Sequence, residues 1–222
     1  LERIELYKQL IDSFPKNHPL KRYRGDVYYE MNNLSRLFSA MKKEGWTSTY
    51  LVKQIDRYIA EIPTRDEFVY KKKYKQFEAG DLKQGLVDAA MEKMEKLKAA
   101  VIAFDAYQAL MKSHSRYDFD DMINWVITAF KENKNLLAQY QEKYLYILVD
   151  EYQDTSGTQN ELVQLLVNYW DQPNLFVVGD DDQSIFRFQG ANVENMLHYQ
   201  KQYHAAITTI VLENNYRSTQ PI

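Results

Sequence analysis

Residues 147–155, which read ILVDEYQDT, decide the fold of this chain. The apolar run 144–149 has the length and the β-branched and aromatic content of a fully covered parallel strand. Asp150 and Glu151 follow at its carboxyl end, where open α/β sheets bind ligands. One carboxylate there can hold Mg²⁺ while its neighbour orients and deprotonates a water molecule. An Asp-Glu pair can also simply cap a strand before a polar turn. The motifs that follow in the chain are therefore needed to choose between a catalytic site and a strand cap.

Two further apolar runs also end in polar motifs. The run 175–178 leads into GDDDQSIFRFQGA at 179–191. The run 208–212 leads into ENNYRS at 213–218. Three parallel strands would bring carboxylates, an amide and a guanidinium to one edge of a sheet. Such a set suits phosphoryl transfer, which depends mostly on positioning and charge stabilisation.

In this order, the three motifs resemble those of the UvrD/Rep-like superfamily-one DNA helicases. DEYQDT is similar to the family's Walker B motif, GDDDQSIFRFQGA to its motif III and LENNYRS to its motif IV. The resemblance covers residues 117–222, whereas the preceding half matches only in position, as the helical insertion of this family. It implies an enzyme that uses ATP and Mg²⁺ to translocate on single-stranded DNA and to unwind duplex DNA.

The resemblance also implies roles at the nucleotide. Asp150 would coordinate Mg²⁺, and Glu151 would activate the hydrolytic water. Gln183 would sense the γ-phosphate and couple it to DNA. Tyr216 would stack on the adenine, and Arg217 would act as an arginine finger.

On the DNA side, the resemblance implies that Phe186 and Phe188 lie against bases of a single strand. The family most often has tryptophan and arginine where Phe188 and Gln189 stand. Aromatic faces bind any base without demanding a sequence. From the residues alone, both phenylalanines can also be core side chains, and Gln183 can close a turn through backbone hydrogen bonds.

A phosphate-binding loop of the form GxxxxGK[ST] does not occur in the sequence. We therefore expect a segment of a longer protein, inactive alone, in which this loop precedes Leu1 and the second motor domain follows Ile222. Two other functions stay open. One is a non-catalytic DNA-binding or interaction module, and the other is the helicase part of a helicase–nuclease subunit.

The net charge of −3 is unevenly distributed along the chain. Residues 1–117 contain 22 basic and 16 acidic side chains, and residues 118–222 contain 6 and 15. A basic first part suits contacts with DNA phosphates, and an acidic second part suits Mg²⁺. The basic run at 71–75 is interleaved with aromatic residues, but a solvated helix face explains such a run equally well.

The composition is that of a soluble globular chain, with 45% hydrophobic and 27% charged residues. No apolar run approaches the roughly 20 residues that span a bilayer, so we expect no membrane partner. The absence of cysteine excludes disulfides and cysteine-ligated metal sites, and it suits a cytoplasmic protein.

The expected architecture is α/β. A largely α-helical insertion subdomain, 1–114, would precede the carboxyl-terminal half of a RecA-like P-loop NTPase sheet, 115–222. The segment YDFDDM at 117–122 has the acids of a helix N-terminus, and Gly45 and Pro63 end two helices. Periodicity predicts helices at 1–14, 28–43, 49–62, 65–78, 81–113, 121–132, 158–169 and 193–203.

Overall fold

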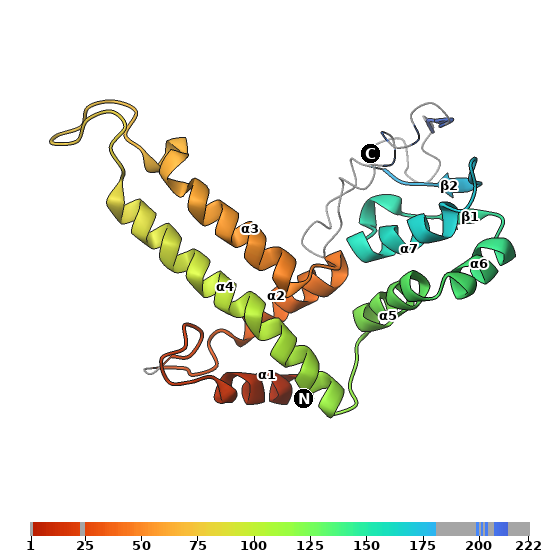
Figure 1. Cartoon of the computed structure of the whole chain (residues 1–222), viewed down its shortest axis with the longest axis horizontal. Coiled ribbons are helices and arrows are strands. Elements are labelled where there is room, and N and C mark those ends of the chain that lie inside the picture. Colours follow the sequence, from red (N-terminus) through yellow and green to blue (C-terminus); the bar gives the residue numbers. More distant parts are fainter. Residues whose placement is uncertain are drawn as a thin grey trace, which may run out of the picture. The chain divides into compact units, whose positions relative to one another are not determined.

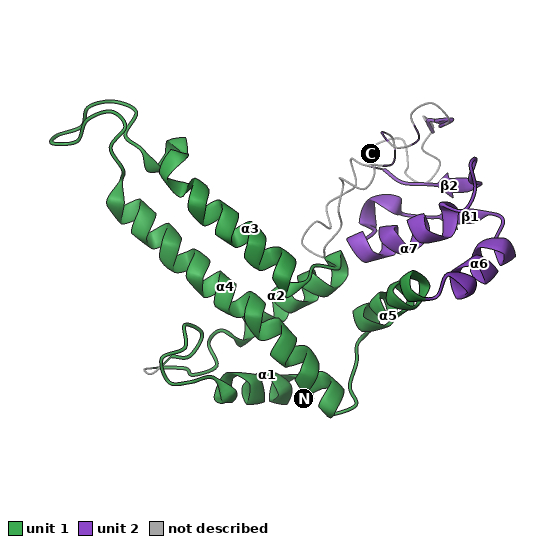
Figure 2. Cartoon of the chain, in the orientation of Figure 1, with its two compact units in different colours: residues 1–132 green, residues 133–222 purple. Residues whose placement is uncertain are grey.

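The computed structural model describes residues 2–22, 25–180, 199, 201, 203 and 207–212. The chain forms two compact units, Leu1–Glu132 and Asn133–Ile222, shown in green and purple in Figure 2. The described part of the first unit is mostly helical, and that of the second combines helices with a two-stranded parallel sheet. The expected α/β class is confirmed.

The first unit contains five α-helices in its described residues. Each corresponds to a helix expected from periodicity, with ends that differ by a few residues. In Figure 1 they run from red to green along the chain. They are α1 (Glu2–Ser13), α2 (Met31–Glu44), α3 (Ser48–Glu61), α4 (Gln84–Ser113) and α5 (Phe119–Glu132), and the 3₁₀ turns η1 (Ile62–Thr64) and η2 (Asp66–Phe68) follow α3.

The helix ends follow from local chemistry. Gly45 ends α2 in the left-handed region, at φ 65° and ψ 23°, a conformation that glycine adopts at no steric cost. Its N–H donates to the carbonyl of Lys42. Thr47 then caps α3, because its hydroxyl accepts the N–H of Tyr50. The helix stop expected at Pro63 is also confirmed, since Pro63 lies in η1.

Aromatic side chains form the centre of the first unit's core. The ring centroids of Tyr7 and Tyr107 lie 4.6 Å apart, and those of Phe38 and Tyr107 lie 5.1 Å apart. All three side chains are fully buried, so this stack joins α1, α2 and α4. The apolar stripe of α4 therefore serves bundle packing, as expected, through Val101, Phe104, Tyr107 and Met111.

The helix expected at 65–78 is wrong. After η2 the chain forms a loop with antiparallel bridges between Val69 and Leu82 and between Tyr74 and Phe77. A helix would place Lys71 and Lys75 four residues apart on one face, where like charges destabilise it. The segment, in which lysines are interleaved with aromatic residues, instead forms a hairpin. Residue spacing within one segment does not reveal the contacts that a hairpin makes between its two arms.

The second unit is built around two parallel strands. Its strands are β1 (Ile147–Val149) and β2 (Leu175–Val177), and its helices are α6 (Lys134–Lys143) and α7 (Gly157–Val167), with the 3₁₀ turn η3 (Tyr152–Asp154) after β1. Ile147 pairs with Leu175 and Val149 with Val177. The helix α6 was not expected from periodicity, although Asn133 caps it by accepting the N–H of Leu136.

The strand predictions are partly wrong. The apolar run 208–212 forms no strand, and its residues Ile210, Val211 and Leu212 are strongly exposed. A strand needs a hydrogen-bonded neighbour, which β-branched composition alone does not supply. The expected full coverage of the first strand is also wrong, because Leu148 is 73% exposed. Burial alternates along β1, so one face lacks a covering layer in the described residues.

The predicted domain boundary stays a prediction. It places residues 115–132 in the second domain, whereas α5 belongs to the first compact unit. The expected helix at 193–203 lies mostly outside the described residues. None of the helices in the described part of the chain has the length and apolar character to cross a membrane.

Candidate active site

The carboxyl ends of β1 and β2 form the candidate site. Beyond the strands, the N–H of Val178 donates to the carbonyl of Val149 at 2.9 Å, and the N–H of Tyr152 donates to the carbonyl of Val178 at 2.9 Å. These bonds hold the two strand ends together. Asp150 and Glu151 therefore lie beside the start of the GDDDQ segment, as the sequence predicts.

Glu151 has an unusual backbone and a fixed side chain. Its φ of 49° and ψ of 45° place it in the left-handed region, which non-glycine residues rarely adopt and which often marks a functional site. Its N–H donates to Oδ1 of Asp150 at 2.9 Å. Its carboxylate accepts a 2.7 Å hydrogen bond from Nε2 of Gln153. The two exposed carboxylates are thus held in a defined arrangement at the strand end.

Gln153 links the two motifs. Its side-chain oxygen accepts the N–H of Asp180 at 3.0 Å, while its amide group donates to Glu151. Gln153 is only 2% exposed, so a buried amide side chain forms both bonds. Gln153 was not among the site residues predicted from the sequence. The available signal was an amide two positions after Glu151 in DEYQDT, which a tight turn can bring back to the carboxylate.

A buried frame supports this turn. Tyr152 is fully buried, and its hydroxyl donates to Oδ1 of Asn160 in α7 at 2.6 Å. Burial, followed by the nearby Tyr199 and Tyr203, raises the pKa of Tyr152 to about 12, so the hydroxyl stays a donor at neutral pH. Ser156 then starts α7 with a capping box. The carboxylates are consequently anchored to a helix as well as to a sheet.

The donor set at the strand end fits a hard divalent cation. Asp150 is exposed, and a carboxylate oxygen is the ligand type that Mg²⁺ prefers. The described residues contain no cluster of three or more potential metal-ligating side chains. Mg²⁺ commonly binds through one or two carboxylates, with water and substrate phosphates completing its shell. Asp150 can supply such a carboxylate.

Five predicted site residues cannot be placed. Gln183, Phe186, Phe188, Tyr216 and Arg217 all lie outside the described residues. Their roles at the γ-phosphate, the adenine and the DNA bases stay predictions. Of the predicted site, the structure places Asp150 and Glu151.

A second polar cluster fixes the start of α5. The N–H of Asp121 donates to Oδ1 of Asp118, and the N–H of Asp118 donates to Oδ2 of Asp121, both at 3.0 Å. This reciprocal cap confirms the helix N-terminus expected in YDFDDM. Nζ of Lys42, from α2, lies 2.8 Å from a carboxylate oxygen of each aspartate. The Lys42 side chain is 3% exposed, so a buried ion cluster joins α2 to α5.

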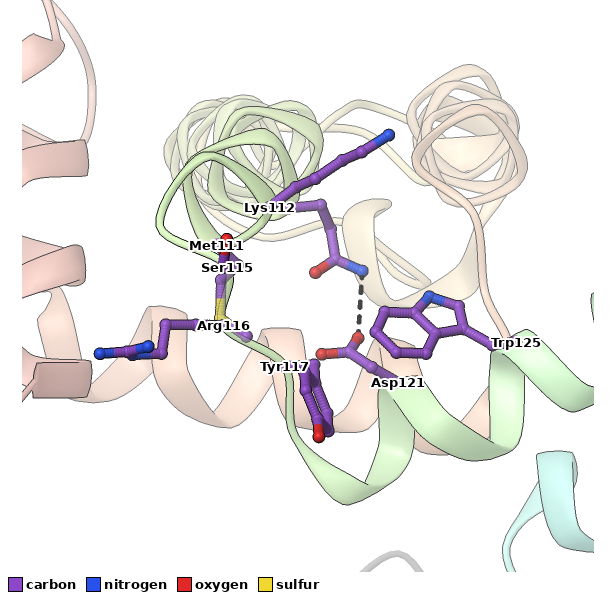
Figure 3. A pocket seen from close by; sticks show the side chains of 8 residues that line it. Met111, Lys112, Ser115, Arg116, Tyr117, Asp121 and Trp125 are labelled. Carbon is purple, nitrogen blue, oxygen red and sulfur yellow. Dashed lines mark hydrogen bonds between the residues drawn. The ribbon is translucent and has the colours of Figure 1, made fainter.

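The same cluster borders a pocket of about 540 Å³ between α4 and α5. Figure 3 shows Tyr117 and Trp125 beside it, with ring centroids 5.3 Å apart. Nε2 of Gln108 donates to Oδ1 of Asp121 at 3.4 Å across it. Asp121 therefore takes part in both the pocket wall and the ion cluster.

The charge of Asp118 should make the first unit's stability depend on pH. Burial on its own would raise the pKa of this carboxyl, but the hydrogen bond and charge of Lys42 outweigh it, and the pKa is lowered. A carboxyl whose pKa is lowered by folding stabilises the folded state at pH values above its ordinary pKa. This stabilisation is lost as the pH falls through the pKa of the folded state.

We therefore expect wild type to be more stable than Asp118→Asn at neutral pH, with a difference that shrinks below about pH 4. Urea unfolding at a series of pH values measures this difference. A difference that stays constant down to the lowest pH would contradict the assigned role of the Asp118 charge.

Carboxylates at the end of a parallel strand, backed by helices, define an α/β protein with a ligand-binding edge. A family model described as UvrD/REP helicase N-terminal domain matches residues 8–204. The chain belongs to this family.

Curated relatives are named as helicases. The chain is 37% identical over 175 residues to the putative ATP-dependent DNA helicase YjcD of Bacillus subtilis (strain 168), which covers 71% of this chain and 22% of that protein. It is 47% identical over 119 residues to the ATP-dependent DNA helicase PcrA of Leuconostoc citreum, an alignment that covers 54% of this chain and 16% of that protein. PcrA of Staphylococcus aureus (strain Mu50 / ATCC 700699) is 45% identical over 119 residues, which again cover 54% of this chain and 16% of that protein. The chain thus spans less than a quarter of these relatives.

Proposed function

We propose that this chain is part of an ATP-dependent DNA helicase that translocates on single-stranded DNA and unwinds duplex DNA. The observation that carries the proposal is the Glu151 carboxylate, fixed by Gln153 at the end of β1. It lies in a segment that the helicase family model matches, and the relatives are named ATP-dependent DNA helicases.

In this proposal the two carboxylates divide the work. Asp150 would hold Mg²⁺ together with the phosphates of ATP. When bound, Mg²⁺ would neutralise charge on the β- and γ-phosphates. Glu151 would accept a proton from a water molecule as the water oxygen bonds to the γ-phosphorus and the bond to the ADP oxygen breaks. The hydrogen bond from Gln153 keeps the Glu151 carboxylate oriented before the reaction.

The rest of the nucleotide site is also a proposal. Gln183 would sense the γ-phosphate, Arg217 would stabilise its charge and Tyr216 would stack on the adenine. Phe186 and Phe188 would contact bases. The RecA-like P-loop NTPase fold is proposed from the family, and the phosphate-binding loop and second motor domain would come from other parts of the longer protein. The small share of each relative that aligns supports this view.

Gln153 is proposed to act as a positioning residue. In Gln153→Leu the carboxylate of Glu151 loses its donor, and the N–H of Asp180 loses its acceptor. We expect kcat for ATP hydrolysis by the intact helicase to fall by about 10–100-fold, as for other supporting partners, with little change in KM. Steady-state kinetics measure both constants.

The matched control is Gln139→Leu, at an exposed position of α6, which should leave both constants near wild type. Equal kinetics for Gln153→Leu and wild type would show that the bridge does not orient Glu151.

A strand-displacement assay tests the function as a whole. The intact protein should separate a labelled duplex that carries a single-stranded tail, and it should need ATP to do so. Its ATP hydrolysis should rise when single-stranded DNA is added. If ATP is hydrolysed without strand separation or DNA stimulation, a different ATP-driven activity has to be considered. If the intact protein neither hydrolyses ATP nor separates the strands, the helicase proposal fails.

A further inference from the structure

The pocket between the end of α4 and the start of α5, which we call the aromatic pocket, has the size of a small-molecule site. Its volume is about 540 Å³, whereas such sites usually measure about 300–1,000 Å³. Its lining residues lie between positions 108 and 125, within the first compact unit. The pocket therefore does not depend on how the two units are arranged.

Two aromatic rings form walls of the aromatic pocket. Tyr117 is 59% exposed and Trp125 is 56% exposed, with ring centroids 5.3 Å apart and an interplanar angle of 51°. Figure 3 shows both rings beside the carboxylate of Asp121. The face of an aromatic ring carries partial negative charge and attracts a cation, most strongly in tryptophan. These walls therefore suit a ligand that combines apolar groups with a positive charge.

Asp121 offers a hydrogen-bond acceptor to the pocket. Its Oδ2 accepts hydrogen bonds from Nζ of Lys42 and from the N–H of Asp118. Its Oδ1 accepts a long bond of 3.4 Å from Gln108. An ionised carboxylate has about four acceptor sites, so Oδ1 can accept a further hydrogen bond from a ligand. Because Lys42 pairs with both aspartates, these three side chains together carry one net negative charge.

The two cationic side chains that line the pocket are directed away from this carboxylate. In Figure 3, Arg116 and Lys112 extend in different directions, both away from Asp121. Arg116 also pairs with Glu2, at 3.0 Å, so its charge is compensated. The groups that gather around the pocket are thus a carboxylate, an amide and two aromatic rings. This set attracts a cation, and the partial burial of the carboxylate strengthens the attraction relative to open solvent.

We propose that the aromatic pocket binds the ammonium group of a small alkylamine. The ammonium group would donate to Oδ1 of Asp121, while Tyr117 and Trp125 lie against the cation and Met111 contacts the alkyl chain. An ammonium group has three donors and needs no fixed plane. A guanidinium binds a carboxylate best through two parallel bonds, and Oδ2 of Asp121 is already occupied by Lys42 and Asp118. The geometry therefore favours an amine over a guanidinium ligand.

The test titrates the 222-residue chain with n-butylamine, which is protonated at neutral pH like a lysine side chain. The indole N–H signals of the three tryptophans are followed by two-dimensional ¹H–¹⁵N NMR. The signal of Trp125, assigned with Trp125→Phe, should shift in a saturable way, and those of Trp46 and Trp170 should stay in place. The neutral analogue 1-butanol, and NaCl at the same concentration, should leave the Trp125 signal unchanged.

Two variants test the assigned contacts. Tyr117→Leu should weaken binding by about 2–5-fold, the effect of one exposed cation–π contact. Asp121→Asn keeps the shape of the side chain but removes its charge, and it should weaken binding by at least about 10-fold. Circular dichroism checks that Asp121→Asn folds, because Asp121 also caps α5. Tyr117 is exposed, so its variant keeps the proposal testable if Asp121→Asn does not fold.

The matched control is Tyr50→Leu, which makes the same substitution at an exposed position of α3 and should bind n-butylamine like wild type. The proposal is overturned if 1-butanol or NaCl shifts the Trp125 signal as n-butylamine does. It is also overturned if Tyr117→Leu keeps the wild-type affinity or if the control loses as much.

A last arm of the experiment distinguishes a free amine from a lysine side chain. The blocked peptide acetyl-Gly-Lys-Gly-amide carries the same ammonium group on a peptide backbone. Tighter binding of n-butylamine than of this peptide supports the small-amine assignment. Tighter binding of the peptide would overturn it in favour of a partner protein. Neither result bears on ATP hydrolysis or strand separation, which are tested in the intact protein.

Discussion

Replacing Glu151 by glutamine in the intact helicase is expected to slow ATP hydrolysis by about 10²–10⁴-fold, the usual contribution of a general base. The side-chain oxygen of glutamine can still accept the hydrogen bond that Gln153 donates to Glu151. The substitution therefore removes the proton acceptor with little change in shape. ATP binding, measured by titration with a fluorescent nucleotide, should stay close to wild type because the proposed magnesium ligand Asp150 is unchanged.

Asp171→Asn is the control for this substitution. Asp171 is an exposed carboxylate that precedes β2, at the opposite end of the strand from the site. Its loss removes one negative charge from the same unit and should leave hydrolysis near the wild-type rate. A comparable loss of activity in both variants would point to a general charge effect and would remove the assigned role of Glu151.

Replacing Lys42 by methionine is expected to destabilise the first unit by about 3–5 kcal/mol, the usual cost of removing one partner of a buried ion pair. Lys42 and Asp121 have side chains that are 3% and 7% exposed. Without the ammonium group, the Asp121 carboxylate stays buried with no cation beside it. Urea unfolding followed by circular dichroism measures the change.

Two further variants separate the charge from the packing. Lys53→Met makes the same substitution at an exposed position of α3 and should change stability by less than about 0.5 kcal/mol. Lys42→Met/Asp121→Asn removes both charges and should recover part of the lost stability. If the double variant is no more stable than Lys42→Met, the buried carboxylate is not the source of the loss.

The sequence predicted the features that depend on near neighbours. Gly45 ends α2 because of its own backbone freedom, and YDFDDM starts α5 because Asp118 and Asp121 cap each other three residues apart. The position of Asp150 and Glu151 followed from an apolar run that stops at Val149. In each case the decisive contacts lie within a few residues, so spacing was sufficient.

Contacts between distant segments could not be predicted in this way. Gln153 bonds to Asp180, which lies 27 positions away, and Lys42 bonds to Asp121, which lies 79 positions away. The lysine run at 71–75 is predicted to be helical from local spacing alone. The structure differs because Tyr70 stacks on Phe77, a contact that forms only where the chain turns back. The run 208–212 has strand composition, but composition does not provide the partner that a strand requires.

Single-turnover release of phosphate from ATP by the intact protein, with single-stranded DNA present, is the most direct test of the proposed active site. We expect rapid release by wild type and by Asp171→Asn, and release slowed by at least about 100-fold in Glu151→Gln. Phosphate release at the wild-type rate by Glu151→Gln would contradict the assignment of the catalytic base at the end of β1.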